Sequence, residues 1–130
     1  YTPRLVNREL VRELGEEVIP IIIDAKRDYT LKMLKDLGIR SGEDDKARLE
    51  ALRDMLSLLP LYGWGMASET EYTPGGTLRV WVDNPFDEYL IAGRLAAFYE
   101  AAEGKRARVE WRDSGPASIT YVLTPSISPA

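Results

Sequence analysis

The chain contains neither cysteine nor histidine among its 130 residues. Without cysteine it can form no disulfide, no thiolate nucleophile and no thiolate metal site. Without histidine it lacks the commonest general base and the commonest metal ligand. We therefore expect no zinc, haem or serine–histidine mechanism, and no resident metal or cofactor. The remaining acid–base candidates are carboxylates, lysines and tyrosines.

Long apolar runs and an excess of positive charge are also missing. The run Val18–Ile23 is followed at once by Asp24 and is far shorter than the roughly 18 residues that a membrane-spanning helix needs. A net charge of -4 disfavours a general nucleic-acid binder, which needs a basic face. No signal-peptide pattern is present. We expect a cytoplasmic domain. Because the chain starts at Tyr1 rather than methionine, we expect a piece of a longer protein or a protein trimmed to its ordered part.

What is present suits one ordinary globular domain. A chain of 130 residues with 45% hydrophobic content has the commonest domain size and enough apolar side chains for a core. We predict a single domain over residues 1–125, with a helical part at 1–60 and a core at 61–125. Residues 126–130 are expected to form a loose tail.

The first part predicts an interrupted amphipathic helix. Its apolar residues recur at spacings of three and four: Leu10, Leu14, Val18, Ile21 or Ile22, Ala25, Tyr29 and Met33. This stripe is expected to face the core. Gly15 and Pro20 predict a break near residue 19, with the helix resuming to about Leu37 and stopping at Gly38.

Further apolar residues of this first helix lie partly off that stripe, namely Leu5, Val6, Leu10, Leu31 and Leu34. One small sheet cannot cover all of this surface, so we expect a homodimer through the N-terminal helix. A second helix is predicted from the capped start Ser41–Asp44 to about Leu58, closed by Pro60. Its apolar face is Leu49, Leu52, Leu56 and Leu59.

Residues 61–125 predict a hairpin, a helix and a second hairpin. The strand at 61–72 places Tyr62, Trp64, Met66, Ser68, Thr70 and Tyr72 on one face, and its glycines Gly63 and Gly65 indicate a bulge or a close approach. After a turn at residues 74–76, Leu78, Val80 and Val82 share one face of the next strand. The last two strands are expected at about 107–112 and 117–124, around the turn residues 113–116.

The helix between the hairpins has clear start and stop signals. Asn84 is expected to cap it, with Pro85 at the first position, and Gly104 to end it after Glu103. Gly93 and Ala97 lie one turn apart, so this helix can lie close to a sheet or a partner helix. The whole pattern predicts an α+β fold: two N-terminal helices, then hairpin–helix–hairpin, with an antiparallel four-stranded sheet and helices packed on one face.

Three short motifs in residues 61–125 resemble the 4-vinyl reductase domain family, which is similar in fold to the TRAPP vesicle-tethering subunits. They are Tyr62–Gly65 at the first strand, Val80–Pro85 before the helix, and the small residues Ala92–Gly93 and Ala96–Ala97. The resemblance implies a small-molecule-binding domain. Several family members carry cysteines in the final hairpin that suggest metal binding; this chain has none, so no metal or redox role is implied. No catalytic residue transfers to this sequence.

Two functions follow as hypotheses. The first is a non-catalytic, dimeric sensor or regulatory domain that binds a hydrophobic or aromatic small molecule. Its candidate pocket residues, which the alternating pattern would equally place in an ordinary core, are Trp64, Met66, Trp81, Tyr89, Phe98 and Tyr121. The alternative is a ligand-free protein–protein assembly module of the TRAPP-like type. An enzyme would need a carboxylate or tyrosine with a strongly shifted pKa in a cleft, and we do not expect one.

The charged residues suggest little chemistry. A mixed-sign set in the second half is typical of a solvated surface: Glu100, Glu103, Glu110, Arg94, Arg108 and Arg112. Paired carboxylates such as Asp44–Asp45 and Asp87–Glu88 suit helix N-termini rather than acid–base catalysis. Asp24 and Asp28 lie one turn apart and form a weak candidate for a hard-cation site.

Overall fold

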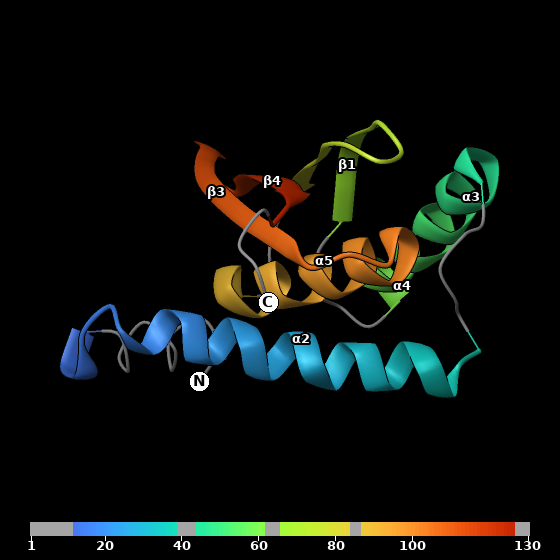
Figure 1. The fold of residues 1–130 in the computed structure, drawn as a ribbon. Helices are drawn as coiled ribbons and strands as arrows, with labels where there is room; N and C mark the ends of the chain where they lie inside the picture. The colour runs from blue at the N-terminus through green and yellow to red at the C-terminus, as the bar shows by residue number, and fades with distance from the viewer. Residues whose placement is uncertain (1–11, 39–43, 62–65, 84–86, 127–130) are drawn as a thin grey trace.

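The computed structural model describes residues 12–38, 44–61, 66–83 and 87–126, and confirms the α+β fold (Figure 1). The helical half contains α2 (Val18–Asp36), α3 (Asp45–Leu56) and the short α4 (Leu58–Leu61). The second half contains β1 (Met66–Tyr72), β2 (Leu78–Asp83), α5 (Glu88–Glu103), β3 (Ala107–Gly115) and β4 (Ser118–Pro125).

The four strands form one antiparallel sheet in the order β1-β2-β4-β3. The alternation predicted for β2 is confirmed, because Leu78, Val80 and Val82 are all completely buried on one face. The turn between β1 and β2 is also confirmed, and Gly75 adopts the positive φ of +80° that it requires. β1 and β3 are the edge strands.

The molecule has three layers: the sheet, then α5, then α2 (Figure 1). Because α5 is covered on both sides, it is buried almost all round rather than along one stripe. Gly93 makes this possible: a Cβ there would lie 2.7 Å from the carbonyl oxygen of Ile23 and 2.7 Å from Cβ of Lys26. The predicted role of this small residue in close helix packing is confirmed, and its partner is α2.

Only part of the α2 face that we expected to be buried is covered: Met33 packs against the core and Val18 is half-buried, but the middle of the stripe points outward. Ile21 and Tyr29 are 66% and 61% exposed, and Ala25 between them is exposed too. The fully buried residues of α2 are Thr30 and Leu34, and Leu34 is one of the residues that we expected on the dimer face. Apolar spacing identified the helix but not the side that the core covers, because α2 is apolar on two sides. Leu5, Val6 and Leu10 lie outside the described residues.

Gly15 interrupts the first helix as predicted, but the two prolines act differently from the predictions. The interruption before α2 lies at Gly15, which has a φ of +86°, so Pro20 falls in the first turn, where a missing N–H costs nothing. Pro60 does not end a helix but lies within α4. Leu49, expected on the buried face of α3, is 39% exposed, whereas Leu52 and Leu59 are buried as expected.

A bulge at Ser68 changes the faces of β1. The register passes from Ala67 opposite Val82 directly to Glu69 opposite Trp81. Thr70 and Tyr72 therefore face the helices together with Ala67, not with Met66. The bulge that we predicted at Gly63 and Gly65 is not tested, because both glycines lie outside the described residues.

The side-chain cap of α5 is Asp87 rather than Asn84. The Asp87 carboxylate accepts hydrogen bonds from the backbone N–H groups of Tyr89 and Leu90, each at 2.9 Å. Asn84 and Pro85 lie outside the described residues. Gly104 ends the helix in the left-handed conformation as predicted. β3 continues through Asp113 to Gly115, so the turn is confined to residues 116–117.

Candidate functional site

The six predicted pocket residues are not gathered in one place. Phe98 and Tyr121 are completely buried between α5 and the sheet, and Tyr89 is half-buried beside them. Trp81 points to the opposite, outer face of the sheet, since it alternates with the buried Val80 and Val82. Met66 lies at the β1 edge and is 58% exposed. Trp64 lies outside the described residues.

Tyr89 and Tyr121 are joined by Trp111, which the sequence prediction missed. The Trp111 ring meets Tyr89 edge-on at 5.9 Å and lies tilted against Tyr121 at 6.1 Å between centroids. The Tyr121 hydroxyl donates to the carbonyl oxygen of Glu88 at 2.8 Å. The alternation of Ala107, Val109 and Trp111 along β3 was the available signal for this ring. The cluster is a packed part of the core at the start of α5.

An apolar groove of about 540 Å³ lies between α3 and the edge strand β1. It is lined by Leu49, Leu52, Arg53, Leu56, Ser57, Met66, Ala67, Thr70 and Tyr72. Its volume falls in the range of small-molecule sites, and its lining is apolar with a few polar groups. Leu49 and Met66 are exposed hydrophobic side chains at this groove. Of the predicted pocket residues that the structure describes, only Met66 lines the groove.

A buried carboxylate stands behind one end of the groove. The Glu103 side chain is fully buried and accepts hydrogen bonds from the Tyr72 hydroxyl and, at 2.9 Å, from the Gly75 N–H. Arg48 of α3 lies 3.5 Å from the same carboxylate. Buried charge is tolerated only when it is paired and hydrogen-bonded, so these contacts hold α3, the β1–β2 turn and α5 together.

The tyrosines of this network are hydrogen-bond donors rather than bases. Burial, followed by the hydrogen bond to Glu103, raises the pKa of Tyr72 well above its ordinary value. Burial, followed by the charge of Glu103, raises the pKa of Tyr99 to about 12. The Tyr99 hydroxyl donates to the carbonyl oxygen of Gly76 at 2.6 Å. Both hydroxyls stay protonated at neutral pH and fix the β1–β2 turn to α5.

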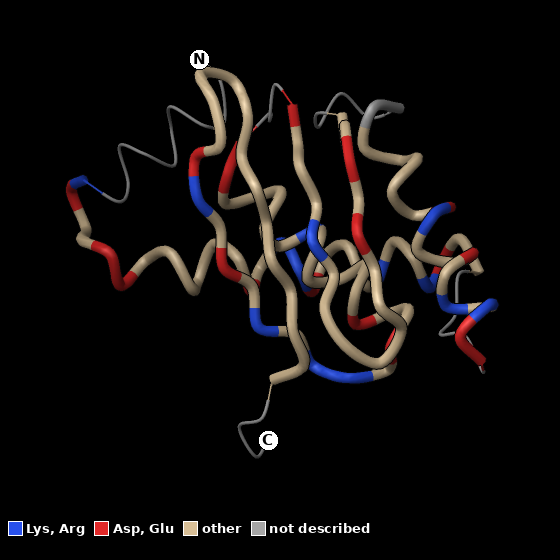
Figure 2. Tube along the Cα trace, turned by 90° about the horizontal axis from the view of Figure 1, so that it is seen from above, with Lys and Arg blue, Asp and Glu red and all other residues tan. Residues whose placement is uncertain are grey.

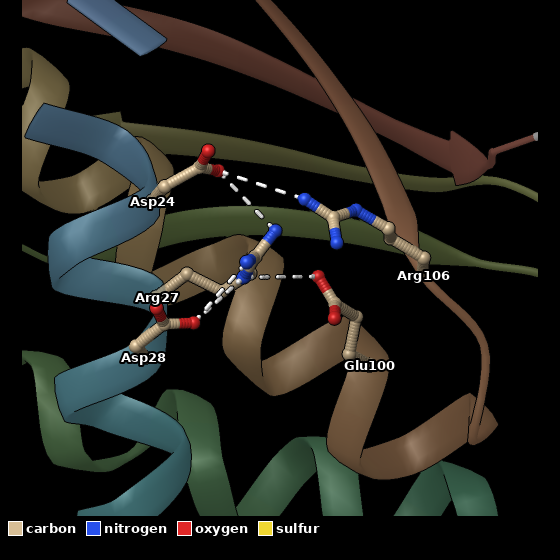
Figure 3. Close-up of polar contacts among 5 residues, drawn as sticks. All are labelled: Asp24, Arg27, Asp28, Glu100 and Arg106. Carbon is tan, nitrogen blue, oxygen red and sulfur yellow. Dashed lines mark hydrogen bonds and ion pairs between the residues drawn. The ribbon is translucent and has the colours of Figure 1, made fainter. Parts of the chain in front are cut away.

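A second polar cluster joins α2, α5 and the segment before β3 (Figure 3). Arg27 lies at its centre, 3.2 Å from Asp24, 3.1 Å from Asp28 and 3.9 Å from Glu100. Arg106 reaches Asp24 at 3.9 Å. Burial raises the pKa of Glu100, and the N–H of Ala107 and the two arginines counter that rise. The arginines thus occupy the carboxylates that were candidates for a cation site.

The charged residues of the second half divide between the core and the surface. Arg94 and Glu103 are buried and Glu100 is half-buried, which contradicts the prediction of a solvated face for these three. Burial lowers the pKa of Arg94 to about 10. The other three, Arg108, Glu110 and Arg112, lie exposed on β3 as predicted. Sequence reasoning missed this division because α5 is covered on two sides, not one.

Within the described part of the chain, no group of three or more acidic residues is arranged to hold a metal ion. The helices described there include none that is long and apolar enough to cross a membrane. No protein-family model and no curated protein matches this chain. Two surfaces of the described part of the chain are candidates for binding: the groove between α3 and β1, and the outward face of α2.

Proposed function

We propose that this chain is a non-catalytic sensor or regulatory domain that binds a hydrophobic or aromatic small molecule in the groove between α3 and β1. The observation that carries the proposal is the groove itself, about 540 Å³ with a largely apolar lining. The resemblance to the 4-vinyl reductase domain family, whose members look like small-molecule-binding domains, supports the same function.

Three polar side chains lie among the mainly apolar residues that line the groove. Arg53, Ser57 and Thr70 lie among the lining residues, and Arg53 and Thr70 are exposed. The Ser57 hydroxyl donates to the carbonyl oxygen of Asp54 at 2.6 Å. A ligand with an apolar body and one acceptor group would bury Leu49 and Met66 while reaching the Arg53 guanidinium. Apolar burial would supply the affinity, and the polar group would set the orientation.

The test is a thermal-shift screen with aromatic and aliphatic compounds, followed by calorimetry of the compounds that stabilise the protein. Leu49→Gln and Met66→Gln place a polar group in the groove at partly exposed positions, so the fold should persist. We expect both variants to lose the thermal shift. Leu37→Gln, at an exposed apolar position just after α2 and outside the groove, is the matched control and should keep it. Absence of any stabilising compound, or equal loss in the control, contradicts the proposal.

The domain is proposed to act as a homodimer through α2. This helix is the outermost layer of the fold (Figure 1), and Ile21, Ala25 and Tyr29 form an exposed apolar stripe along it. Ile22 and Leu90 extend the stripe toward α5. A second copy would bury this surface, and the small Ala25 at its centre would allow two helices to approach closely.

The charges at the two ends of the stripe favour an antiparallel pair. The end before α2 carries Glu13, Glu16 and Glu17 against Arg12, and the last turns carry Lys32 and Lys35 against Asp36. Antiparallel pairing about Ala25 places the acidic end of each copy beside the basic end of the other. Such complementarity selects orientation as well as partner.

If no ligand occupies the groove, the same stripe supports the alternative function, a ligand-free assembly module. Light scattering after size exclusion distinguishes the oligomeric state: we expect a dimer for the parent and a monomer for Tyr29→Glu. Leu49→Gln, at an exposed apolar position on α3, is the control and should remain dimeric. A monomeric parent at tens of micromolar contradicts the dimer and leaves the groove to be tested by the thermal-shift screen.

A further inference from the structure

The outer face of the sheet, which turns away from α5, is not covered by any element of the described residues (Figures 1 and 2). Figure 2 looks down on this face, with charged positions on β1, β2 and β3 and an uncharged β4 between β2 and β3. A hollow of about 390 Å³ lies here. Its lining is Arg79, Trp81, Glu110, Trp111, Arg112, Thr120 and Val122.

Three of these residues form a row across the sheet. Thr120 of β4 is directly opposite Trp81 of β2 and directly opposite Arg112 of β3. Side chains of directly opposed residues share a face, so an indole, a hydroxyl and a guanidinium lie side by side. Two strand spacings separate the outer members of the row, about 9.6 Å. That span is close to the length of one aromatic ring with a short substituent.

The hydroxyl at the centre of the row is unsatisfied. Thr120 is 3% exposed, and its Oγ1 makes no hydrogen bond to any described group. Buried polar atoms are nearly always paired, and leaving one unpaired is destabilising. The neighbouring Ser118 does not share this state, because its hydroxyl donates to Asp83 at 2.7 Å. Thr120 thus supplies an unused hydrogen-bonding group at the floor of the hollow.

The guanidinium of Arg112, at one end of the row, also lacks a partner among the described residues. Arg112 makes no hydrogen bond or ion pair within the described part of the chain, whereas Arg79 and Arg108 on this face are paired. Arg108 contacts Glu110 at 2.8 Å, and Arg79 contacts Glu71 at 3.6 Å. Arg79 also lies over the Trp81 ring, 6.0 Å from its centroid, and helps to hold the indole in place. As far as the described residues go, the Arg112 guanidinium is therefore a positive charge in the hollow without a partner.

From this row we infer a second binding site, on the outer face of the sheet, for a small aromatic carboxylate. The ring of the ligand packs against Trp81, and its carboxylate accepts hydrogen bonds from Arg112 and from the Thr120 hydroxyl. A guanidinium matches the two oxygens of a carboxylate, and an indole offers a flat apolar surface to a ring. A cation would be repelled by Arg112. A purely apolar ligand would leave both polar groups unpaired.

The site is tested by isothermal titration calorimetry with benzoate and 2-naphthoate, ligands for which about millimolar affinity is expected from their size. 2-Naphthamide keeps the ring without the charge, and acetate keeps the charge without the ring. Binding of both aromatic acids, with 2-naphthamide and acetate at least about tenfold weaker, is the expected result. Equal binding of the amide, or of acetate, overturns the assignment, as does no binding of either acid.

Variants locate the site. Arg112→Gln and Trp81→Leu should each weaken 2-naphthoate at least about tenfold. Arg108→Gln, on the same strand and face but paired with Glu110, is the matched control and should bind like the parent. Met66→Gln alters only the α3–β1 groove, so 2-naphthoate bound beside Trp81 and Arg112 keeps its affinity in this variant, whereas 2-naphthoate bound in the groove loses it. Loss in either control, or retention in Arg112→Gln, contradicts the proposal.

Thr120→Val gives a readout that does not depend on the ligand. Valine has nearly the shape of threonine without the hydroxyl, so removing an unpaired buried oxygen should keep or raise the melting temperature. The same variant should weaken 2-naphthoate severalfold because the carboxylate loses a donor. A lower melting temperature together with unchanged affinity shows that the hydroxyl serves the fold and overturns its role in binding.

Discussion

The Tyr72 hydroxyl donates a hydrogen bond to the carboxylate of Glu103, which follows it by 31 positions in the sequence. Glu103 is the last residue of α5, the end of a helix where a negative charge is disfavoured. The carboxylate is nevertheless fully buried there, because Tyr72, the Gly75 N–H and Arg48 surround it with donors. A contact between the first hairpin and the central helix thus depends on one acidic side chain.

Tyr72→Phe should therefore destabilise the protein although it keeps the ring. Loss of one donor leaves a buried carboxylate less satisfied, which costs about 1–3 kcal/mol in the free energy of unfolding. Chemical denaturation followed by circular dichroism measures this. Tyr29→Phe removes an exposed hydroxyl and should stay within about 0.5 kcal/mol of the parent. Equal stability of Tyr72→Phe and the parent would show that the network carries no net energy.

Gly93→Ala should destabilise the packing of α2 on α5. Alanine is the better helix former by about 1 kcal/mol, yet its Cβ would lie 2.7 Å from the Ile23 carbonyl oxygen, so α2 must move. We expect a net loss of about 1–3 kcal/mol in the free energy of unfolding. Gly115→Ala, whose Cβ would come no nearer than 3.7 Å to Ser118, is the control. A stabilised Gly93→Ala variant would contradict the close crossing.

Glu100→Gln should change how stability depends on pH. Burial raises the pKa of Glu100 in the folded state, so the folded protein keeps this proton where the unfolded chain has lost it. Its contribution to the free energy of unfolding is fully present below the ordinary glutamate pKa, and falls as pH rises through the folded value. The Glu100→Gln variant has no carboxyl group to ionise at this position, so it does not lose this stability as pH rises.

The melting temperature of Glu100→Gln relative to the parent should therefore increase between about pH 4 and about pH 7. Differential scanning fluorimetry at several pH values measures the difference. Asp28→Asn removes an exposed carboxylate from the same arginine and should give a flatter difference curve. A Glu100→Gln curve parallel to that of the parent would mean that burial does not govern this carboxyl.

Asp87→Ala should weaken the start of α5. Its carboxylate accepts two backbone N–H groups in a buried place, so we expect a loss of about 2 kcal/mol in the free energy of unfolding. Asp87→Asn retains an Oδ1 that can accept both N–H groups and should recover most of that loss. Asp44→Ala removes the exposed cap of α3 and should cost about 1 kcal/mol or less. If Asp87→Ala and Asp44→Ala lowered the free energy of unfolding equally, burial of Asp87 would not strengthen its cap.

Local signals in the sequence predicted most of the fold. Alternation identified β2, Gly104 marked the end of α5, and the small residues of α5 indicated a close crossing. These succeed because strand alternation and the left-handed end of a helix are determined within a few residues. The candidate site was predicted less well: Met66 lines the groove, but Trp81 faces the other side of the sheet, and Phe98 and Tyr121 fill the core.

By itself, the sequence excluded histidine and cysteine chemistry and determined which segments form helices and strands, because both depend on residue type and local spacing. The tertiary structure decided which apolar face of α2 is covered, where the β1 bulge changes the inward side chains, and which charges α5 buries. These depend on what each element packs against. The periodicity of a segment does not contain that information. Ile21, Ala25 and Tyr29 are exposed because α5 packs against the opposite side of α2.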